Sequence, residues 1–378
     1  MSSHGMGVAF RLGMSTNLSR RKTLGLLAAL PAGGLAHARA ARRKDGSLGE
    51  IAARAGVVYG ASAGTVIFDD AEYRLLYLKH CKALTTDVDM KFDWLRPEAG
   101  KWDWAPADRL AAFAERTGMT LRGHALIWNE NAPDWLKALS LAEIRRVFDE
   151  HIETVVARYA GRVAVWDVVN EPFWPGHGKP GGYRTGPWYE AFGPGYVERA
   201  LKRARAVDPH VRLAINEAHC ERDDGVGRAI REGMARLVAQ LRDVDAPLDA
   251  LGFQGHLQPG RPYDDAAFAA FLRRFSGLEL HITELDVNDE TFPAAIRERD
   301  ALVARRYHDF LSAVLAVPAV NTVINWQLAD HYSWYNDLAR SGQLRSRRAP
   351  RPLPFDSAYR RKPAWFAMAR AFRERKAS

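Results

Sequence analysis

Cysteine is nearly absent from this chain, whose 378 residues include only Cys81 and Cys220. Two cysteines so far apart in sequence argue against a disulfide framework and a cysteine-based zinc site. Because both lie beside expected strands, we expect buried free thiols, with a single disulfide bridge as the alternative. Long apolar runs are also missing. The stretch at residues 24–36 is interrupted by proline and glycine and is shorter than the roughly 20 residues that cross a bilayer.

Three further features that would indicate other folds are missing. The chain contains no internal repeat of roughly 20–50 residues, which argues against solenoids and propellers. No linker rich in glycine, serine or proline divides it, so we expect a single folded domain. No glycine-rich phosphate loop follows the first expected strand, which weakens the case for a doubly wound nucleotide-binding sheet.

Charge is unevenly distributed, with a formal net charge of +9. Part of this excess lies in residues 1–38, which contain four basic residues and no acidic one. The most basic later run, residues 345–351, reads RSRRAPR, and no nucleic-acid-binding motif accompanies it. We therefore interpret this run as a solvated loop and expect no nucleic-acid partner.

The N-terminal residues resemble a twin-arginine export signal. Residues 19–24 read SRRKTL, with Thr23 where such signals usually carry phenylalanine, and the apolar stretch at 24–36 follows. Residues 36–38 read AHA, a small-x-small cleavage site. We expect residues 1–38 to be a cleavable signal peptide and residues 39–378 to be a periplasmic or secreted protein without a membrane anchor. The alternative is a disordered basic tail.

From residue 50 onward, short apolar runs alternate with helical patterns. One helix is predicted after a capping box of Ser140 and Glu143, and another between Pro106 and Gly118. The expected strands are residues 57–61, 83–88, 120–126, 163–170, 212–216, 250–255, 278–283 and 322–326. Eight strands with helical crossovers predict an α/β fold, a (β/α)8 TIM barrel. A doubly wound sheet is the second alternative.

Two of these apolar runs end on a glutamate. Residues 166–172 read WDVVNEP and residues 281–286 read HITELD, which places Glu171 and Glu284 after expected strands four and seven. In such a barrel both would lie at the C-terminal ends of the strands, where active sites are found. A protonated carboxyl beside an ionised one is the arrangement of retaining glycosidases. The alternative for each glutamate is a salt bridge to a nearby arginine.

The chain resembles glycoside hydrolase family 10, the xylanase family, over residues ~56–375, the whole expected barrel by the usual count of strands and helices. The resemblance is carried by the two glutamate motifs and by an ordered set of further motifs. These are MK at 90–91, GHALIW at 123–128, GFQGH at 252–256, Trp326, Trp334, PLPFD at 352–356 and KPAW at 362–365. Asn-Glu-Pro alone is shared by several related barrel families, whereas the ordered set is specific.

The resemblance implies a role for each matching residue. Glu171 would be the general acid/base and Glu284 the nucleophile. Asn170 would hydrogen-bond the sugar 2-hydroxyl, and Gln254 and His256 would orient Glu284.

Five more residues would form the sugar-binding surface by the same resemblance. Lys91 and His124 would bind hydroxyls of the sugar next to the cleaved bond, and Trp128, Trp326 and Trp334 would wall the cleft. Taken singly, the histidines and tryptophans have an ordinary alternative as core residues.

The implied activity is that of a retaining endo-1,4-β-xylanase that needs neither a metal nor an organic cofactor. Its partner would be a polysaccharide, xylan or a related β-glycan, and the protein would act as a monomer. There are two alternatives: a hydrolase that uses the same chemistry on another β-linked glycan, and a glycan-binding barrel without catalysis.

This chain departs from the family pattern in the sugar-binding shell. Where the family has a Glu-Asn pair that binds the second sugar on the non-reducing side, residues 87–88 read Asp-Val, and Phe92 replaces tryptophan. Residues 129–131 read NEN, where His and Gln are common in the family. Residues 216–219 read NEAH instead of Asn-Asp-Tyr-Asn, which removes a tyrosine. These changes spare the catalytic residues and bear on the identity of the glycan.

Overall fold

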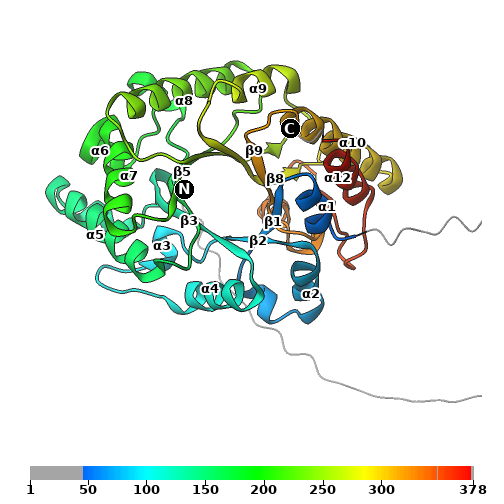
Figure 1. The fold of residues 1–378 in the computed structure, drawn as a ribbon, viewed down its shortest axis with the longest axis horizontal. Coiled ribbons are helices and arrows are strands. Elements are labelled where there is room, and N and C mark those ends of the chain that lie inside the picture. Colours follow the sequence, from blue (N-terminus) through cyan, green and yellow to red (C-terminus); the bar gives the residue numbers. More distant parts are fainter. Residues whose placement is uncertain (1–45, 347, 376–378) are drawn as a thin grey trace, which may run out of the picture. The chain divides into compact units, whose positions relative to one another are not determined.

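The structure, a computed structural model, describes residues 46–346 and 348–375. The expected signal peptide at residues 1–38 lies outside these residues. The described part of the chain from Gly46 onward forms a single compact unit. Its strands enclose a central barrel and its helices lie around the outside (Figure 1).

The barrel consists of eight parallel strands within the described residues. They are β1 (Val58–Ala63), β2 (Ala83–Thr86), β3 (Thr120–Trp128), β4 (Val165–Asn170), β5 (Arg212–Glu217), β6 (Ala250–Phe253), β8 (Glu279–Val287) and β9 (Val320–Asn325). Each strand pairs in parallel with its neighbours, and the pairing of β1 with β9 closes the ring. The predicted (β/α)8 barrel is therefore confirmed.

Several strand ends differ from the expected ones by a residue or two, and the end of β8 differs most. The strand predicted at 278–283 continues as β8 to Val287, so Glu284 lies inside the strand and not at its end. The short strand β7 (His256–Leu257) pairs with Asp286 and Val287 and so extends the ladder. Burial also continues through Val287, because residues of this strand pack into the protein on both faces.

The helices cover the barrel between successive strands. The α-helices are α1 (Leu48–Arg54), α2 (Ala71–His80), α3 (Phe92–Leu95), α4 (Ala105–Thr117), α5 (Leu141–Tyr159), α6 (Pro187–Phe192), α7 (Tyr196–Val207), α8 (Gly225–Asp243), α9 (Asp265–Leu272), α10 (Ile296–Leu315), α11 (Tyr335–Arg340) and α12 (Pro363–Glu374). The 3-10 helices are η1 (Thr65–Phe68), η2 (Asn129–Asn131), η3 (Asp134–Ala138), η4 (Pro175–His177), η5 (Pro180–Gly182), η6 (Gly193–Gly195) and η7 (Asp330–Tyr332).

The sequence signals at the ends of two helices are confirmed. Ser140 and Glu143 make both hydrogen bonds of the capping box before α5. Gly118 ends α4 at a φ of 67°, a left-handed conformation that glycine adopts without a steric penalty.

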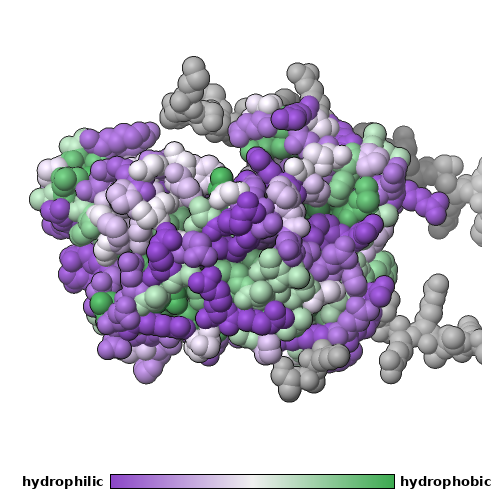
Figure 2. All heavy atoms as spheres, turned by 90° about the horizontal axis from the view of Figure 1, so that it is seen from above, coloured by the Kyte–Doolittle hydropathy of each residue, from purple (hydrophilic) through white to green (hydrophobic). Residues whose placement is uncertain are grey.

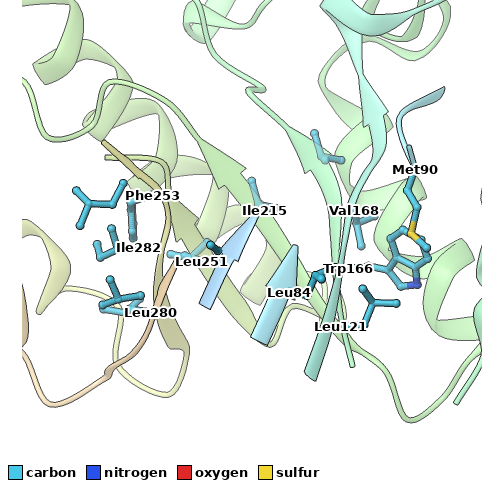
Figure 3. Close-up of a cluster of buried hydrophobic side chains, with 14 of the residues drawn as sticks. Leu84, Met90, Leu121, Trp166, Val168, Ile215, Leu251, Phe253, Leu280 and Ile282 are labelled. Atoms are coloured by element: carbon cyan, nitrogen blue, oxygen red, sulfur yellow. The ribbon is translucent and has the colours of Figure 1, made fainter. Parts of the chain in front are cut away.

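The core is continuous from the strands to the helices that cover them. Figure 3 shows side chains of neighbouring strands, among them Leu121, Trp166 and Val168, packed in one apolar cluster. Trp166 is 1% exposed and lies against Gly123 on the adjacent strand, where a Cβ atom would be 2.1 Å from the indole ring. A glycine is therefore required at position 123 to admit the tryptophan.

The two cysteines are buried free thiols, as expected, and no bridge joins them. The face in Figure 2 is largely hydrophilic, with small hydrophobic patches between polar residues. Among residues 46–346 and 348–375, none of the helices combines the length and apolar character needed to span a membrane.

Candidate active site

Glu171 and Glu284 are held by the same residue at the C-terminal end of the barrel. Glu171 directly follows β4, and its φ of 50° places its backbone in the left-handed region. The side-chain amide of Gln254, just after β6, donates to Glu171 Oε1 at 2.8 Å. The backbone carbonyl of Gln254 accepts the N–H of Glu284, also at 2.8 Å. Gln254 therefore contacts Glu284 through its backbone carbonyl, whereas its side-chain amide binds the other glutamate.

Glu171 is buried beside an arginine that the sequence analysis did not identify. Arg184 Nη2 lies 2.8 Å from Glu171 Oε2, and Arg184 Nε donates to the Glu171 backbone carbonyl at 2.9 Å. Burial raises the pKa of Glu171, although Arg184 and Gln254 act in the opposite direction. The carboxyl is thus biased toward its protonated form and remains hydrogen-bonded.

Glu284 has the opposite bias. His256 Nε2 lies 3.1 Å from Glu284 Oε2, and Asn216 Nδ2 donates to Glu284 Oε1 at 2.7 Å. Burial acts to raise the pKa of Glu284, but the hydrogen bond from His256 and the charges of His124, His256 and Lys91 outweigh it and hold the pKa below its usual value. The Glu284 carboxylate is therefore biased toward its ionised form.

His256 is kept charged by a second carboxylate. Its Nδ1 atom lies 3.0 Å from Asp286 Oδ2, and Asp286 also accepts hydrogen bonds from Trp334 Nε1 at 2.8 Å and Tyr335 Oη at 3.1 Å. Burial disfavours the charged ring, but Asp286 and Glu284 prevail and raise the pKa of His256 well above its ordinary value. Asp286 belongs to the HITELD motif, so its position at the strand end was the available sequence signal.

Asn216 connects the two glutamate motifs and was not assigned a role from the sequence. Its amide donates to Asn170 Oδ1 at 2.9 Å as well as to Glu284, and its Oδ1 accepts from Thr283 Oγ1 at 2.6 Å. Gly252 leaves room for this network, because a Cβ atom there would lie 2.3 Å from Asn216 Oδ1. Asn170 Nδ2 is buried and has no partner among the described residues.

Beneath His124 lies a buried ion pair. His124 Nδ1 is 3.0 Å from Asp167 Oδ2, and Asp167 also binds Arg122 through both of its oxygens. Arg122 in turn reaches His281 Nδ1 at 2.8 Å. Asp167 and Arg122 thereby fix the orientation of the His124 ring.

The aromatic residues gather around the histidines and Lys91. The Lys91 ammonium lies 5.2 Å from the ring centroid of Trp128 and 5.7 Å from that of Trp326. The Trp326 ring is 5.4 Å from His124 and 6.3 Å from His256, and Trp334 is 5.1 Å from His256. The indole N–H of Trp128 is buried without a partner in the described part of the chain.

The contacts join all ten predicted site residues into one polar and aromatic cluster at the C-terminal ends of the strands. They are Lys91, His124, Trp128, Asn170, Glu171, Gln254, His256, Glu284, Trp326 and Trp334. Among residues 46–346 and 348–375, no group of three His, Cys, Asp or Glu side chains is arranged to hold a metal ion.

Comparison with known proteins identifies relatives over nearly the whole described chain. The sequence model of glycosyl hydrolase family 10 matches residues 47–371. Endo-1,4-beta-xylanase B of Thermotoga neapolitana is 30% identical over 344 residues, covering 88% of this chain and 93% of the relative. Endo-1,4-beta-xylanase C of Phanerodontia chrysosporium is 34% identical over 300 residues, covering 76% and 69%.

Solved structures agree with this relationship. Native xylanase 10B of Thermotoga maritima aligns with a TM-score of 0.75 at 28% identity, covering 86% of this chain and 98% of that one. A variant of xylanase 10C of Cellvibrio japonicus, solved with xylopentaose, aligns with a TM-score of 0.78 at 26% identity, covering 88% and 70%.

Proposed function

Because this chain belongs to glycosyl hydrolase family 10, we propose that it cleaves internal β-1,4 linkages of xylan with retention of configuration. The similar proteins named above are endo-1,4-beta-xylanases or xylanases. The observation that carries the proposal is the opposite bias of the two glutamates. Burial raises the pKa of Glu171, whereas hydrogen bonding and positive charge lower the pKa of Glu284. A retaining glycosidase requires one protonated and one ionised carboxyl.

In the first step, the Glu284 carboxylate attacks the anomeric carbon. The bond from that carbon to the glycosidic oxygen breaks, and Glu171 donates its proton to the departing oxygen. The product is a glycosyl ester on Glu284 and a shortened glycan with a free hydroxyl. Charged His256 and the Asn216 amide hold Glu284 for this attack.

In the second step, water attacks the same carbon and releases Glu284 as a carboxylate. Glu171, now ionised, takes the proton from that water and returns to its starting state. Arg184 lies 2.8 Å from Glu171 and stabilises the ionised carboxylate between the two steps. Two inversions at one carbon give net retention.

The remaining residues bind the sugar. The unpartnered Nδ2 of Asn170 donates to the sugar 2-hydroxyl, a contact that strengthens as positive charge develops on the ring. Lys91 and His124 bind hydroxyls of the same sugar. Trp128, Trp326 and Trp334 offer apolar ring faces to the glycan, and the unpartnered indole N–H of Trp128 is available to a sugar hydroxyl.

A different β-linked glycan is the second candidate substrate, favoured by the altered positions Asp87, Val88 and Ala218. These positions belong to the sugar-binding shell, and losing polar contacts there changes specificity while sparing the chemistry. Export is also part of the proposal: residues 1–38 act as a twin-arginine-type signal, and residues 39–378 work as a monomer in the periplasm or outside the cell.

The experiment is a comparison of the wild-type protein with Glu284→Gln and Glu171→Gln. Reducing-sugar release is measured from xylan, cellulose and mixed-linkage β-glucan. We expect xylan to be the preferred substrate and Glu284→Gln to abolish release from every glycan. Faster release from cellulose or β-glucan than from xylan would mean that the substrate is a glucan. Binding of xylan without any sugar release would mean that the protein is a glycan-binding barrel without catalysis.

A further inference from the structure

Gln327 lies in an unusual backbone conformation next to the candidate active site. It follows Trp326 directly after β9, and its φ of 70° is in the left-handed region. Residues with a Cβ atom seldom adopt this region because the side chain crowds the backbone, whereas glycine adopts it freely. Residues held in such strained conformations cluster at functional sites.

The side chain and backbone of Gln327 join three strands. Its backbone N–H donates to Ser62 Oγ in β1 at 2.9 Å. Its side-chain Nε2 donates to Asp87 Oδ2, just after β2, at 2.8 Å. Gln327 therefore reaches from the end of β9 across β1 to the end of β2.

The other atom of the Gln327 amide is left without a partner. Gln327 is 9% exposed, and its Oε1 is buried and accepts no hydrogen bond from residues 46–346 or 348–375. A buried carbonyl oxygen without a donor is unfavourable and is expected to be satisfied by a bound group. Because Oε1 can only accept, the missing group must be a donor such as a sugar hydroxyl.

Asp87 places this amide on the side of the site where Lys91 lies. Burial raises the pKa of Asp87. The charges of Lys91 and His124 act to lower this pKa, and the charge of Glu284 acts to raise it. Asp87 directly follows β2, at the C-terminal end of the barrel, and Lys91 lies four residues further along the chain. Asp87 and Gln327 thus present two acceptor groups beside the Lys91 donor.

We propose that Gln327 is a specificity-determining residue for the glycan on the non-reducing side of the cleaved bond. Its Oε1 accepts a hydrogen bond from one sugar hydroxyl, and its Nε2 holds Asp87 to accept a second hydroxyl. The sugar recognised is a β-1,4-linked pyranose with two neighbouring hydroxyls. This inference rests on the proposed glycosidase function.

The pair also accounts for a departure seen in the sequence. Val88 stands where an amide was expected from the family resemblance, and valine offers no polar group. Gln327 places an amide next to Asp87, but this amide comes from the end of β9 and not from the end of β2. The acid–amide pair is therefore rebuilt from residues that are 240 apart in sequence.

The decisive variant is Gln327→Gly, because it removes the side chain and relieves the backbone strain together. Thermal unfolding and steady-state kinetics are measured with p-nitrophenyl β-xylobioside and with xylan. We expect unchanged or higher thermal stability and a fall in kcat/KM of about tenfold, mainly through a higher KM, as expected for the loss of one binding contact. A residue with only a structural role would not combine higher stability with weaker binding.

Asp245→Gly is the matched control. Asp245 also has a left-handed φ, 49°, and it is exposed in the loop between α8 and β6, at the opposite end of the barrel. We expect this variant also to show unchanged or higher thermal stability and to keep the wild-type KM. Wild-type kinetics in Gln327→Gly would overturn the inference.

Gln327→Glu gives a second, independent readout. It keeps an acceptor oxygen but places a carboxylate against Asp87, so we expect KM to rise as the pH rises and the pair loses its shared proton. A pH-independent KM equal to that of the wild type would count against the role of Asp87. If the wild-type protein cleaves neither xylobioside nor xylan, the proposed function fails first, and that result differs from an active enzyme indifferent to position 327.

Discussion

The side-chain amide of Gln254 donates to the carboxyl of Glu171 across 2.8 Å. The same residue accepts the backbone N–H of Glu284 through its carbonyl. One residue after β6 therefore fixes the carboxyl of one glutamate and the backbone of the other. The spacing of the two glutamates depends on the barrel and on this residue together.

Replacing Gln254 with leucine should alter the pH dependence of catalysis. The hydrogen bond from Gln254 lowers the pKa of Glu171, so its loss raises that pKa further. Because Glu171 must be protonated to act as an acid, the basic limb of the kcat/KM profile should move to higher pH. A pH–rate profile on p-nitrophenyl β-xylobioside measures this, and a basic limb that stays in place or moves down would contradict it.

His256→Gln should move the acidic limb instead. Hydrogen bonding and charge from His256 hold the pKa of Glu284 low, so a neutral replacement raises it. Glu284 must be ionised to attack, and activity should then be lost at a higher pH on the acidic side. The same profile tests this. The basic limb, which reports Glu171, serves as the internal control and should stay within experimental error.

Charged His256 should also stabilise the fold in a pH-dependent way. Although burial acts against it, Asp286 and Glu284 raise the pKa of His256 above its ordinary value. This contribution is complete below the unfolded pKa of ~6.5 and is lost as the pH rises through the higher folded pKa. Urea unfolding from pH 6 upward should show the difference between wild type and His256→Gln shrinking. A constant difference would mean that His256 does not change charge.

Removing the negative charge of Asp167 should destabilise the protein strongly. Asp167 is 1% exposed and pairs with Arg122 and His124, so Asp167→Asn leaves a buried guanidinium without its counter-ion. The expected loss is about 3–5 kcal/mol in the free energy of unfolding.

Asp337→Asn is the control for Asp167→Asn. Asp337 pairs with Arg340, and both side chains are well exposed. An exposed pair of this kind is worth at most about 1 kcal/mol. Urea unfolding at neutral pH measures both variants, and equal losses would show that the buried pair carries no special weight.

Gly123→Ala should destabilise the core through a clash with Trp166. The added Cβ atom would lie 2.1 Å from the buried ring, so the strands or the ring must shift. Overpacking of this kind costs roughly 1–3 kcal/mol. Gly195→Ala is the control, because a Cβ atom there meets nothing within 4 Å and its φ of −64° suits alanine. Thermal unfolding of both variants decides the point, and equal melting temperatures would contradict the account.

Much of the fold was predictable because most strands are short apolar runs and because helices such as α4 and α5 carry a capping signal in the sequence. The end of β8 was not, because it depends on pairing with β7, which is only two residues long. A bridge that short leaves no periodic pattern in the sequence.

The candidate site was predictable where residue type and position in the motif agreed, as for Glu171 and Glu284. The contact of the Gln254 side chain with Glu171 was not expected, because the direction of a side chain depends on the local turn and not on the motif. Arg184 was missed because it lies in a loop 13 residues beyond Glu171, and only the folded chain brings it back. Gln327 has no sequence signal, since its conformation and its unpartnered oxygen exist only in three dimensions.

The claim that Glu284 is the nucleophile of a retaining glycosidase is tested most directly by trapping the covalent glycosyl-enzyme intermediate. The wild-type protein is incubated with a 2-fluoro xylobioside that carries an activated leaving group, then digested and analysed by mass spectrometry. The account predicts a stable adduct of one glycosyl unit on the peptide that contains Glu284, and no adduct in Glu284→Gln. An adduct on another residue, or rapid hydrolysis of xylan with inversion of configuration, would contradict it.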